Sequence, residues 1–231
     1  MPASFTRLGH LISTERLDVR GVDGLYAIGF RIVDRADDLW TARFNRFKAG
    51  VPGAVDAGVR AFVAAWEGIE SKSGLGPVVV VGAIPSGHAV LTEGSAVHRM
   101  GAEVSAQKDW AWRPDLLSKR VHRPLESLPS TAERDEEVRR VYAARCVGRP
   151  IGIFLVVDDF CTRGSTMGDI CRALREANPG WMVRGAVLAK TERAEAWSGG
   201  VSNDHVPSAL SRVWGEGWAR SPWQTHGGRG E

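Results

Sequence analysis

IGIFLVVDDFCTRGST, residues 151–166, joins an apolar run, two adjacent carboxylates and a short turn rich in hydroxyl groups. A helical pattern follows over residues 167–178. Ligands of open α/β sheets bind where strands end, and helix N-termini attract anions. The stretch therefore predicts a strand, a turn and a helix that together bind a sugar phosphate. The acids would accept from the sugar hydroxyls, and the turn would bind the phosphate.

Other apolar runs extend this pattern into a sheet. Residues 78–81 and 182–190 are almost wholly apolar, which is typical of strands buried on both faces of a parallel sheet. Helical patterns alternate with the strands, and we expect right-handed crossovers between them. The predicted fold is α/β, with a central, mainly parallel sheet flanked by helices and a small irregular hood. The remaining expected elements are a strand at 25–32, helices at 37–50, 52–70, 89–103 and 131–146 (capped by Thr131), and irregular structure at 106–130.

Length and composition predict a globular protein. The 231 residues suffice for one α/β domain of good size or two small ones. We expect an N-terminal arm at residues 1–24, one domain at 25–195, and a C-terminal extension with a flexible end at 196–231.

No stretch approaches the roughly 20 apolar residues of a membrane span, and residues 1–20 lack a signal-peptide run. The three cysteines form no CxxC pair, so we expect a cytoplasmic protein without a structural metal site.

The acid pair and the turn behind it are the candidate site. Neighbouring side chains on a strand alternate sides, so we expect Asp158 and Asp159 to divide their tasks. One would hold ribose hydroxyls, and the other would orient backbone or a metal-bound water. Gly164 permits a tight turn, and successive N–H groups can bind a phosphate. An ordinary capped turn with exposed acids is the alternative, but the complete pattern favours phosphate binding.

Residues 154–174, FLVVDDFCTRGSTMGDICRAL, resemble the PRPP-binding motif of the type I phosphoribosyltransferases. The resemblance implies that Asp158 and Asp159 contact the ribose hydroxyls of 5-phosphoribosyl-1-diphosphate (PRPP). It implies Mg²⁺ arriving with the diphosphate, and a pyrophosphate loop at residues 84–88. The substrate-binding residues that it implies are Pro85, Ser86, Gly87, His88, Cys161, Thr162, Arg163, Gly164, Ser165 and Thr166.

Residues 25–193 are more loosely similar to the ComF-like branch of this superfamily, through Lys48-Ala49-Gly50 and the segment Glu126–Arg134. Two departures matter. The paired cysteines of an N-terminal zinc ribbon are missing, and Arg163 stands where the family has a phosphate-binding Thr. Its guanidinium could strengthen phosphate binding, fill the pocket or reach another anion.

Several single residues have two interpretations. His88 is either a diphosphate contact or proton donor, or a surface histidine. Lys190 is either a contact to base or phosphate, or a solvated lysine at a strand end, which is the commoner case. We expect Cys161 to be a small filler. Arg43, Arg46 and Lys48 suggest a solvated basic face, whereas Arg120, His122 and Arg123 suggest a mobile loop over the substrate.

Two functions follow from these patterns. The first is transfer of phosphoribosyl from PRPP to a nitrogen base or amine. The second is a non-catalytic sensor or effector that keeps the pocket for PRPP or a ribonucleotide, in DNA uptake or a bacterial defence or accessory cassette. We also expect a homodimer and a protein partner at Trp214, Trp218 and Trp223. A nucleic-acid partner is a weaker idea, and a membrane partner is not expected.

Overall fold

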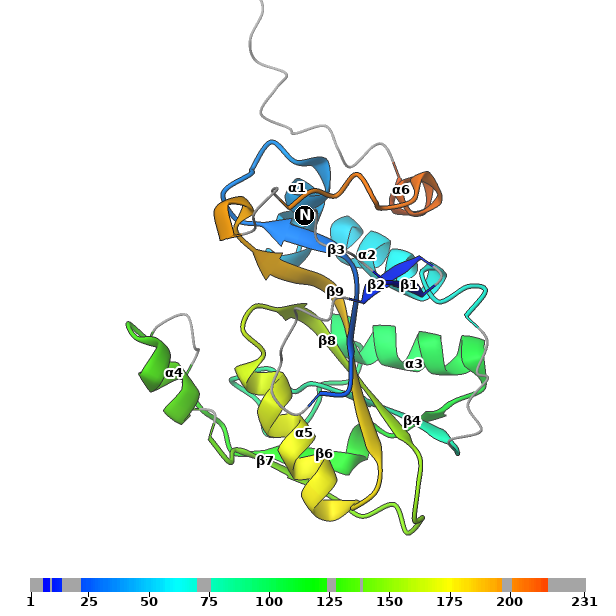
Figure 1. The fold of residues 1–231 in the computed structure, drawn as a ribbon, viewed down its shortest axis with the longest axis vertical. Coiled ribbons are helices and arrows are strands. Elements are labelled where there is room, and N and C mark those ends of the chain that lie inside the picture. Colours follow the sequence, from blue (N-terminus) through cyan, green and yellow to red (C-terminus); the bar gives the residue numbers. More distant parts are fainter. Residues whose placement is uncertain are drawn as a thin grey trace, which may run out of the picture.

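A computed structural model describes residues 6–8, 10–13, 22–69, 76–123, 128–137, 139–196 and 201–215 (Figure 1). Within these ranges the central sheet has the strand order β1-β2-β3-β9-β8-β4-β5. Neighbouring strands from β3 to β5 pair in parallel. The sheet strands are β1 (Thr6–Leu8), β2 (Leu11–Ser13), β3 (Leu25–Ile32), β4 (Val78–Gly82), β5 (Ala111–Trp112), β8 (Ile153–Cys161) and β9 (Met182–Glu192).

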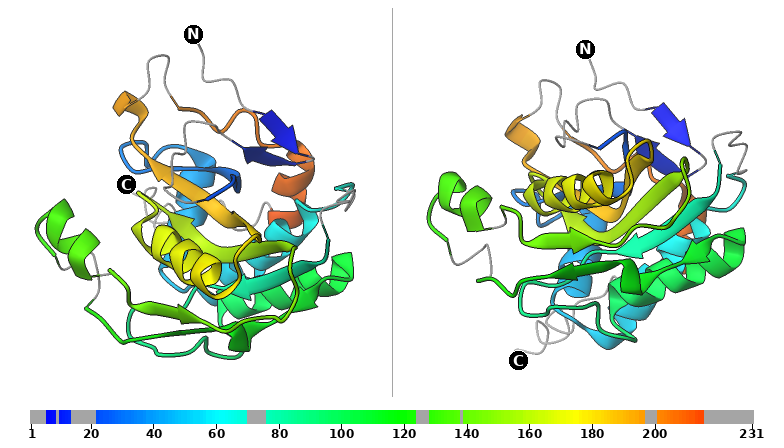
Figure 2. Two further views of the ribbon diagram at one scale, coloured as in Figure 1. Left: turned by 60° about the horizontal axis from the view of Figure 1, so that its bottom comes forward. Right: turned by 90° about the horizontal axis from the view of Figure 1, so that it is seen from below.

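The helices lie on both faces of the sheet, as predicted. Figure 2 shows α5 on one face and α1, α2 and α3 on the other. The helices are α1 (Leu39–Lys48), α2 (Pro52–Ala64), α3 (Ala96–Lys108), α4 (Thr131–Glu137), α5 (Ser165–Ala177) and α6 (Ser208–Trp214), with short 3₁₀ helices η1 (Pro114–Leu116) and η3 (Ala194–Ala196). A separate two-stranded antiparallel ribbon consists of β6 (Leu117–Lys119) and β7 (Tyr142–Ala144). The expected mainly parallel sheet flanked by helices is thus confirmed.

Continuous burial explains why the central strands could be predicted. The first five residues of β8, from Ile153 to Val157, are all buried, and β9 has an unbroken buried run from Gly185 to Thr191. Strands covered on both faces have no polar side to alternate with the apolar one. Glycines permit the closest contacts, because a Cβ on Gly185 would lie only 2.6 Å from Leu25.

The order in which successive strands are added to the sheet reverses between β4 and β8. From β4 the chain crosses through α3 to β5 at one edge of the sheet, whereas from β8 it crosses through α5 to β9 on the other side. Because the two strands are parallel neighbours, their carboxyl ends lie together at this reversal. Open α/β sheets bind ligands in the crevice at such a switch point.

Some expected boundaries were wrong. Residues 89–95 are loop, and α3 runs instead from Ala96 to Lys108. The helix expected over 131–146 ends at Glu137, because the chain then forms β7. Its cap is Ser130 rather than Thr131: the Ser130 hydroxyl accepts from Glu133 N at 3.1 Å, and Ser130 N donates to the Glu133 carboxylate at 3.1 Å. The "irregular" residues 106–130 contain β5, η1 and β6.

Part of the predicted N-terminal arm extends the central sheet, and part of the predicted C-terminal extension packs on α2. Strands β1 and β2 form an antiparallel hairpin that extends the sheet from β3. Helix α6 packs on α2, and Trp214 is fully buried against Trp40 and Phe44. Trp214 therefore belongs to the core and not to a docking surface, while Trp218 and Trp223 lie outside the described residues. None of the described helices is long and apolar enough to cross a membrane.

Candidate functional site

The acid pair lies at the carboxyl end of β8, and both side chains are partly buried. Asp159 N donates to Asp158 Oδ1 at 2.8 Å, and Phe160 N donates to Asp159 Oδ1 at 2.7 Å. Among the described residues neither carboxylate forms an ion pair. Burial, followed by repulsion from Asp159, raises the pKa of Asp158 well above its ordinary value. Burial also raises the pKa of Asp159. Partly buried acids without a contacting cation form a strong site for a cation or for hydroxyl donors.

Two lysines from different elements act on the acid pair through space. The charge of Lys119, on β6, favours ionised Asp158, whereas that of Lys48, at the end of α1, favours ionised Asp159. The two acids are therefore influenced by cations on different elements. Lys119 is only 5% exposed, and burial lowers its pKa to about 8. Sequence analysis did not identify Lys119.

The turn after β8 leads directly into α5. Thr162 and Arg163 are exposed, and Gly164 has φ +82° and caps the helix. Gly164 O accepts from Gly168 N at 2.7 Å, so the first turn of α5 is regular. Ser165 and Thr166 begin this helix and are partly buried. The first N–H groups of a helix have no partner inside it, so the end of α5 can bind an anion beside the acid pair.

Lys190 holds this turn. Its side chain is buried, and Nζ donates to the carbonyls of Thr162 and Thr191 (3.2 Å to the latter) and to Glu192 Oε1 at 2.5 Å. The favoured expectation of a solvated lysine was therefore wrong. These three acceptors engage all three ammonium protons, so in this structure Lys190 supports the turn rather than facing a ligand.

The second predicted loop follows β4. Ile84 is buried, Ser86 is partly buried, and Pro85, Gly87 and His88 are exposed. His88 N donates to Pro85 O at 3.0 Å, which closes the turn, and His88 Nδ1 lies 3.3 Å from Thr92 Oγ1. Because β4 and β8 are adjacent and parallel, this loop and the acid pair share one edge of the sheet.

Two other residues have surroundings that limit their roles. Cys161 is buried, and burial raises the pKa of its thiol to about 12, so it fills space beside the turn. Arg43 was expected on a solvated basic face, but it is buried, stacks over the Trp40 ring at 4.7 Å and bonds Ser211. It is thus part of the packing between α1 and α6.

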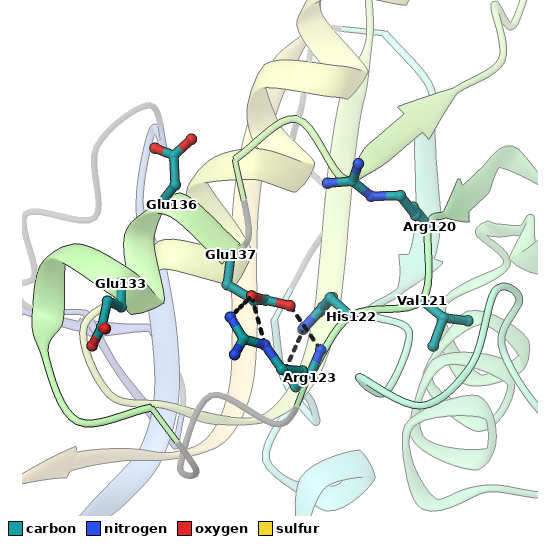
Figure 3. A pocket seen from close by; sticks show the side chains of 7 residues that line it. All are labelled: Arg120, Val121, His122, Arg123, Glu133, Glu136 and Glu137. Atoms are coloured by element: carbon teal, nitrogen blue, oxygen red, sulfur yellow. Dashed lines mark hydrogen bonds and ion pairs between the residues drawn. The ribbon is translucent and has the colours of Figure 1, made fainter.

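A cavity of about 350 Å³ opens between α4 and the segment that follows β6 (Figure 3). Glu137 accepts from Arg123 N at 2.9 Å and from the Arg123 guanidinium at 2.7 Å. These hydrogen bonds link the two sides of the cavity. The lining residues are Arg120, Val121, His122, Arg123, Glu133, Glu136 and Glu137. Part of the segment predicted to be a mobile loop therefore forms one wall, and its links to α4 fix the width of the opening.

Magnesium is compatible with the acid pair. Among the described residues no group of three or more His, Cys, Asp or Glu could hold a metal ion. Mg²⁺, however, commonly binds through one or two carboxylates together with substrate phosphates, and it keeps several waters. Asp158 and Asp159 have no contacting cation among the described residues, so their chemistry fits such an ion.

The comparisons with known proteins give little further information. No family model and no curated protein matches the sequence. One solved structure that it resembles is described as the allosteric regulatory enzyme of purine biosynthesis. The identity is 21% and the TM-score 0.33; the match covers 58% of this chain and 25% of that one. A likeness of this size carries no argument, so the fold class stands on the sheet and helices described above.

Proposed function

We propose that this protein binds PRPP or a ribonucleotide, with Mg²⁺, at the carboxyl ends of β4 and β8. The observation that carries the proposal is the acid pair: two partly buried carboxylates at the switch point, without an ion-pair partner among the described residues. Uncompensated buried charge costs stability, and carboxylates with raised pKa values are typical of functional sites. Ribose offers two neighbouring hydroxyls that carboxylates can accept from.

The flanking groups fit the remaining parts of the ligand. The turn at residues 162–166 and the start of α5 would bind the 5′-phosphate through backbone N–H groups. Lys119 would face the diphosphate, because it is a buried cation within electrostatic range of Asp158 and beside the second loop. The ribose would then lie between two anion-binding elements that belong to neighbouring parallel strands.

Asp158 and Asp159 are the residues that would hold Mg²⁺ together with the ligand. The bound ion would neutralise charge on the diphosphate. The protein itself would contribute positioning and electrostatic stabilisation rather than covalent chemistry.

The reaction class that suits this ligand is phosphoribosyl transfer to a nitrogen base or amine. The nitrogen would form a bond to the anomeric carbon while the bond from that carbon to the diphosphate oxygen breaks. The diphosphate would leave with the electron pair of that bond, and the proton of the nitrogen would pass to water. Within the superfamily we propose the ComF-like branch, on the basis of residues 25–193. Lys48 supports this choice, because the KxG element places it in electrostatic range of Asp159.

The binding experiment is calorimetric titration of PRPP with Mg²⁺ into the wild-type protein and into Asp158→Asn and Asp159→Asn. We expect wild-type binding and a loss of at least about tenfold in each variant, as for removal of charged hydrogen-bond acceptors. Asp109→Asn is the matched control, since Asp109 is exposed at the end of α3 and has a left-handed conformation that Asn tolerates. Unchanged affinity in both site variants would contradict the proposal.

Arg163 motivates the second candidate, a sensor that binds PRPP without turning it over. It stands at the position of a phosphate-binding Thr in the family motif, and it is exposed. Diphosphate release, measured over a panel of nucleobases and amines, separates the two candidates. Release with any acceptor supports the transferase, whereas binding without release across the panel supports the sensor.

A further inference from the structure

The β6–β7 ribbon contacts both α5 and the loop after β4, which carry the two halves of the proposed site. The contacts with α5 come first. Asp169, buried on α5, accepts from Arg140 N at 3.0 Å and from Tyr142 N at 2.8 Å. Arg172, one turn further, donates to Asp169 at 2.7 Å and to Tyr142 O at 2.8 Å. Both backbone polar groups of Tyr142 are thus bound by side chains of the helix that begins at the phosphate turn.

The second set of contacts is between the ribbon and the loop after β4. The Tyr142 hydroxyl donates to Ile84 O at 2.9 Å and accepts from Ile84 N at 3.0 Å. Lys119 Nζ donates to the same carbonyl at 2.8 Å. Ile84 immediately precedes residues 85–88, so these contacts fix the base of the proposed diphosphate loop.

Backbone contacts hold the rest of this loop against the ribbon. Lys119 N donates to Ala89 O at 3.0 Å, and His122 N donates to Ser86 O at 3.3 Å. Among the described residues, Tyr142 contacts both α5 and the loop after β4. Its backbone binds side chains of α5, and its hydroxyl binds Ile84. Its ring is buried, so the hydroxyl has one fixed direction.

We propose, on the basis of the proposed function, that Tyr142 is a positioning residue that fixes the diphosphate loop relative to the phosphate turn. The two loops bind opposite ends of the same ligand, and their spacing decides whether both ends are bound at once. A ligand without a diphosphate needs only the acid pair and the turn. The Tyr142 hydroxyl should therefore matter for PRPP and not for ribose 5-phosphate.

Tyr142→Phe removes the hydroxyl and keeps the buried ring. We expect calorimetry to give about tenfold weaker binding of PRPP with Mg²⁺, because the Ile84 N–H and C=O lose a buried partner. The affinity for ribose 5-phosphate should stay within about twofold of wild type. Tyr26→Phe is the matched control: its hydroxyl accepts from Arg184 at 3.0 Å near the amino end of β3, away from both loops.

A second measurement does not depend on any ligand. Hydrogen exchange at the Ile84 amide should become faster in Tyr142→Phe and stay unchanged in Tyr26→Phe. Equal weakening for both ligands would show a general packing defect and overturn the inference, and so would unchanged PRPP binding. Failure of the proposed function is read separately, from a wild-type protein that binds neither ligand.

Discussion

Asp158 is the residue on which the site most depends, and its position is energetically unfavourable. A carboxylate whose pKa is raised by burial binds a proton more tightly in the folded than in the unfolded state. Above the ordinary pKa of an aspartate, this shift therefore lowers the free energy of unfolding. The cost disappears as the pH falls to that ordinary value. Such a cost to stability is expected of a residue kept for ligand binding.

Asp158→Asn should therefore stabilise the protein while weakening ligand binding. Replacing the carboxylate by an amide removes the cost of the buried charge, so we expect Asp158→Asn to have a higher Tm than the wild type at pH 7. The gain should shrink as the pH is lowered toward 4, because wild-type Asp158 then becomes protonated. Thermal unfolding over this pH range tests the prediction, with Asp109→Asn as control. A destabilised Asp158→Asn at pH 7 would contradict it.

The residues around the acids differ in how far sequence could identify them. Asp158, Asp159 and Gly164 lie in one short motif, whose order of strand, acids and turn indicates the chemistry. Lys119 and Tyr142 gave no such signal. They contact Ile84 from 35 and 58 residues away in sequence, and their strands have only three residues each, too few for a pattern.

Among the elements, the turn between β8 and α5 depends on backbone conformation. Gly164 has φ +82°, a value that residues with a Cβ adopt only with strain. We expect Gly164→Ala to reduce the free energy of unfolding by about 1–2 kcal/mol and to weaken phosphate binding, because the N–H groups of the turn would move.

Gly87→Ala is the matched control for this turn. Gly87 lies in the other loop, its φ is not in the left-handed region, and a Cβ there would meet nothing within 4 Å. Urea unfolding of both variants measures the difference. If Gly164→Ala unfolds at the same urea concentration as Gly87→Ala, the conformation of the turn is not the determinant that we describe.

Elements were predictable where burial is continuous and unpredictable where the strands are very short. β4, β8 and β9 appear in the sequence as apolar runs, since they are covered on both faces. β1, β2, β6 and β7 have three residues each, and no period can be defined over such lengths. The helical pattern expected after Ser130 continued past Glu137, although tertiary pairing with β6 selects strand for Tyr142.

At the scale of the whole molecule, α6 completes the core, although the C-terminal region has little sequence pattern. Trp214 is fully buried between Trp40 and Phe44, and its ring also lies close to Gly58 of α2. A docking surface was expected there because tryptophans near a Gly-rich end suggest an interface. The hydrophobic contacts could not be foreseen, since they join positions about 170 residues apart.

Trp214→Ala should lower the free energy of unfolding by about 3–5 kcal/mol, as for other buried aromatic residues. Leu39→Ala is the control, because Leu39 is 44% exposed at the start of α1 and should cost far less. Chemical denaturation followed by circular dichroism measures both. A loss for Trp214→Ala no larger than that for Leu39→Ala would mean that α6 is not part of the core.

The central claim is that the acid pair and the turn before α5 bind a ribose and its phosphate together. Phosphorus NMR of ribose 5-phosphate, titrated with wild-type protein and with the double variant Asp158→Asn/Asp159→Asn, tests it most directly. We predict that the phosphate resonance shifts and broadens with the wild type and stays that of free ligand with the variant. Identical spectra for the two proteins would contradict the account.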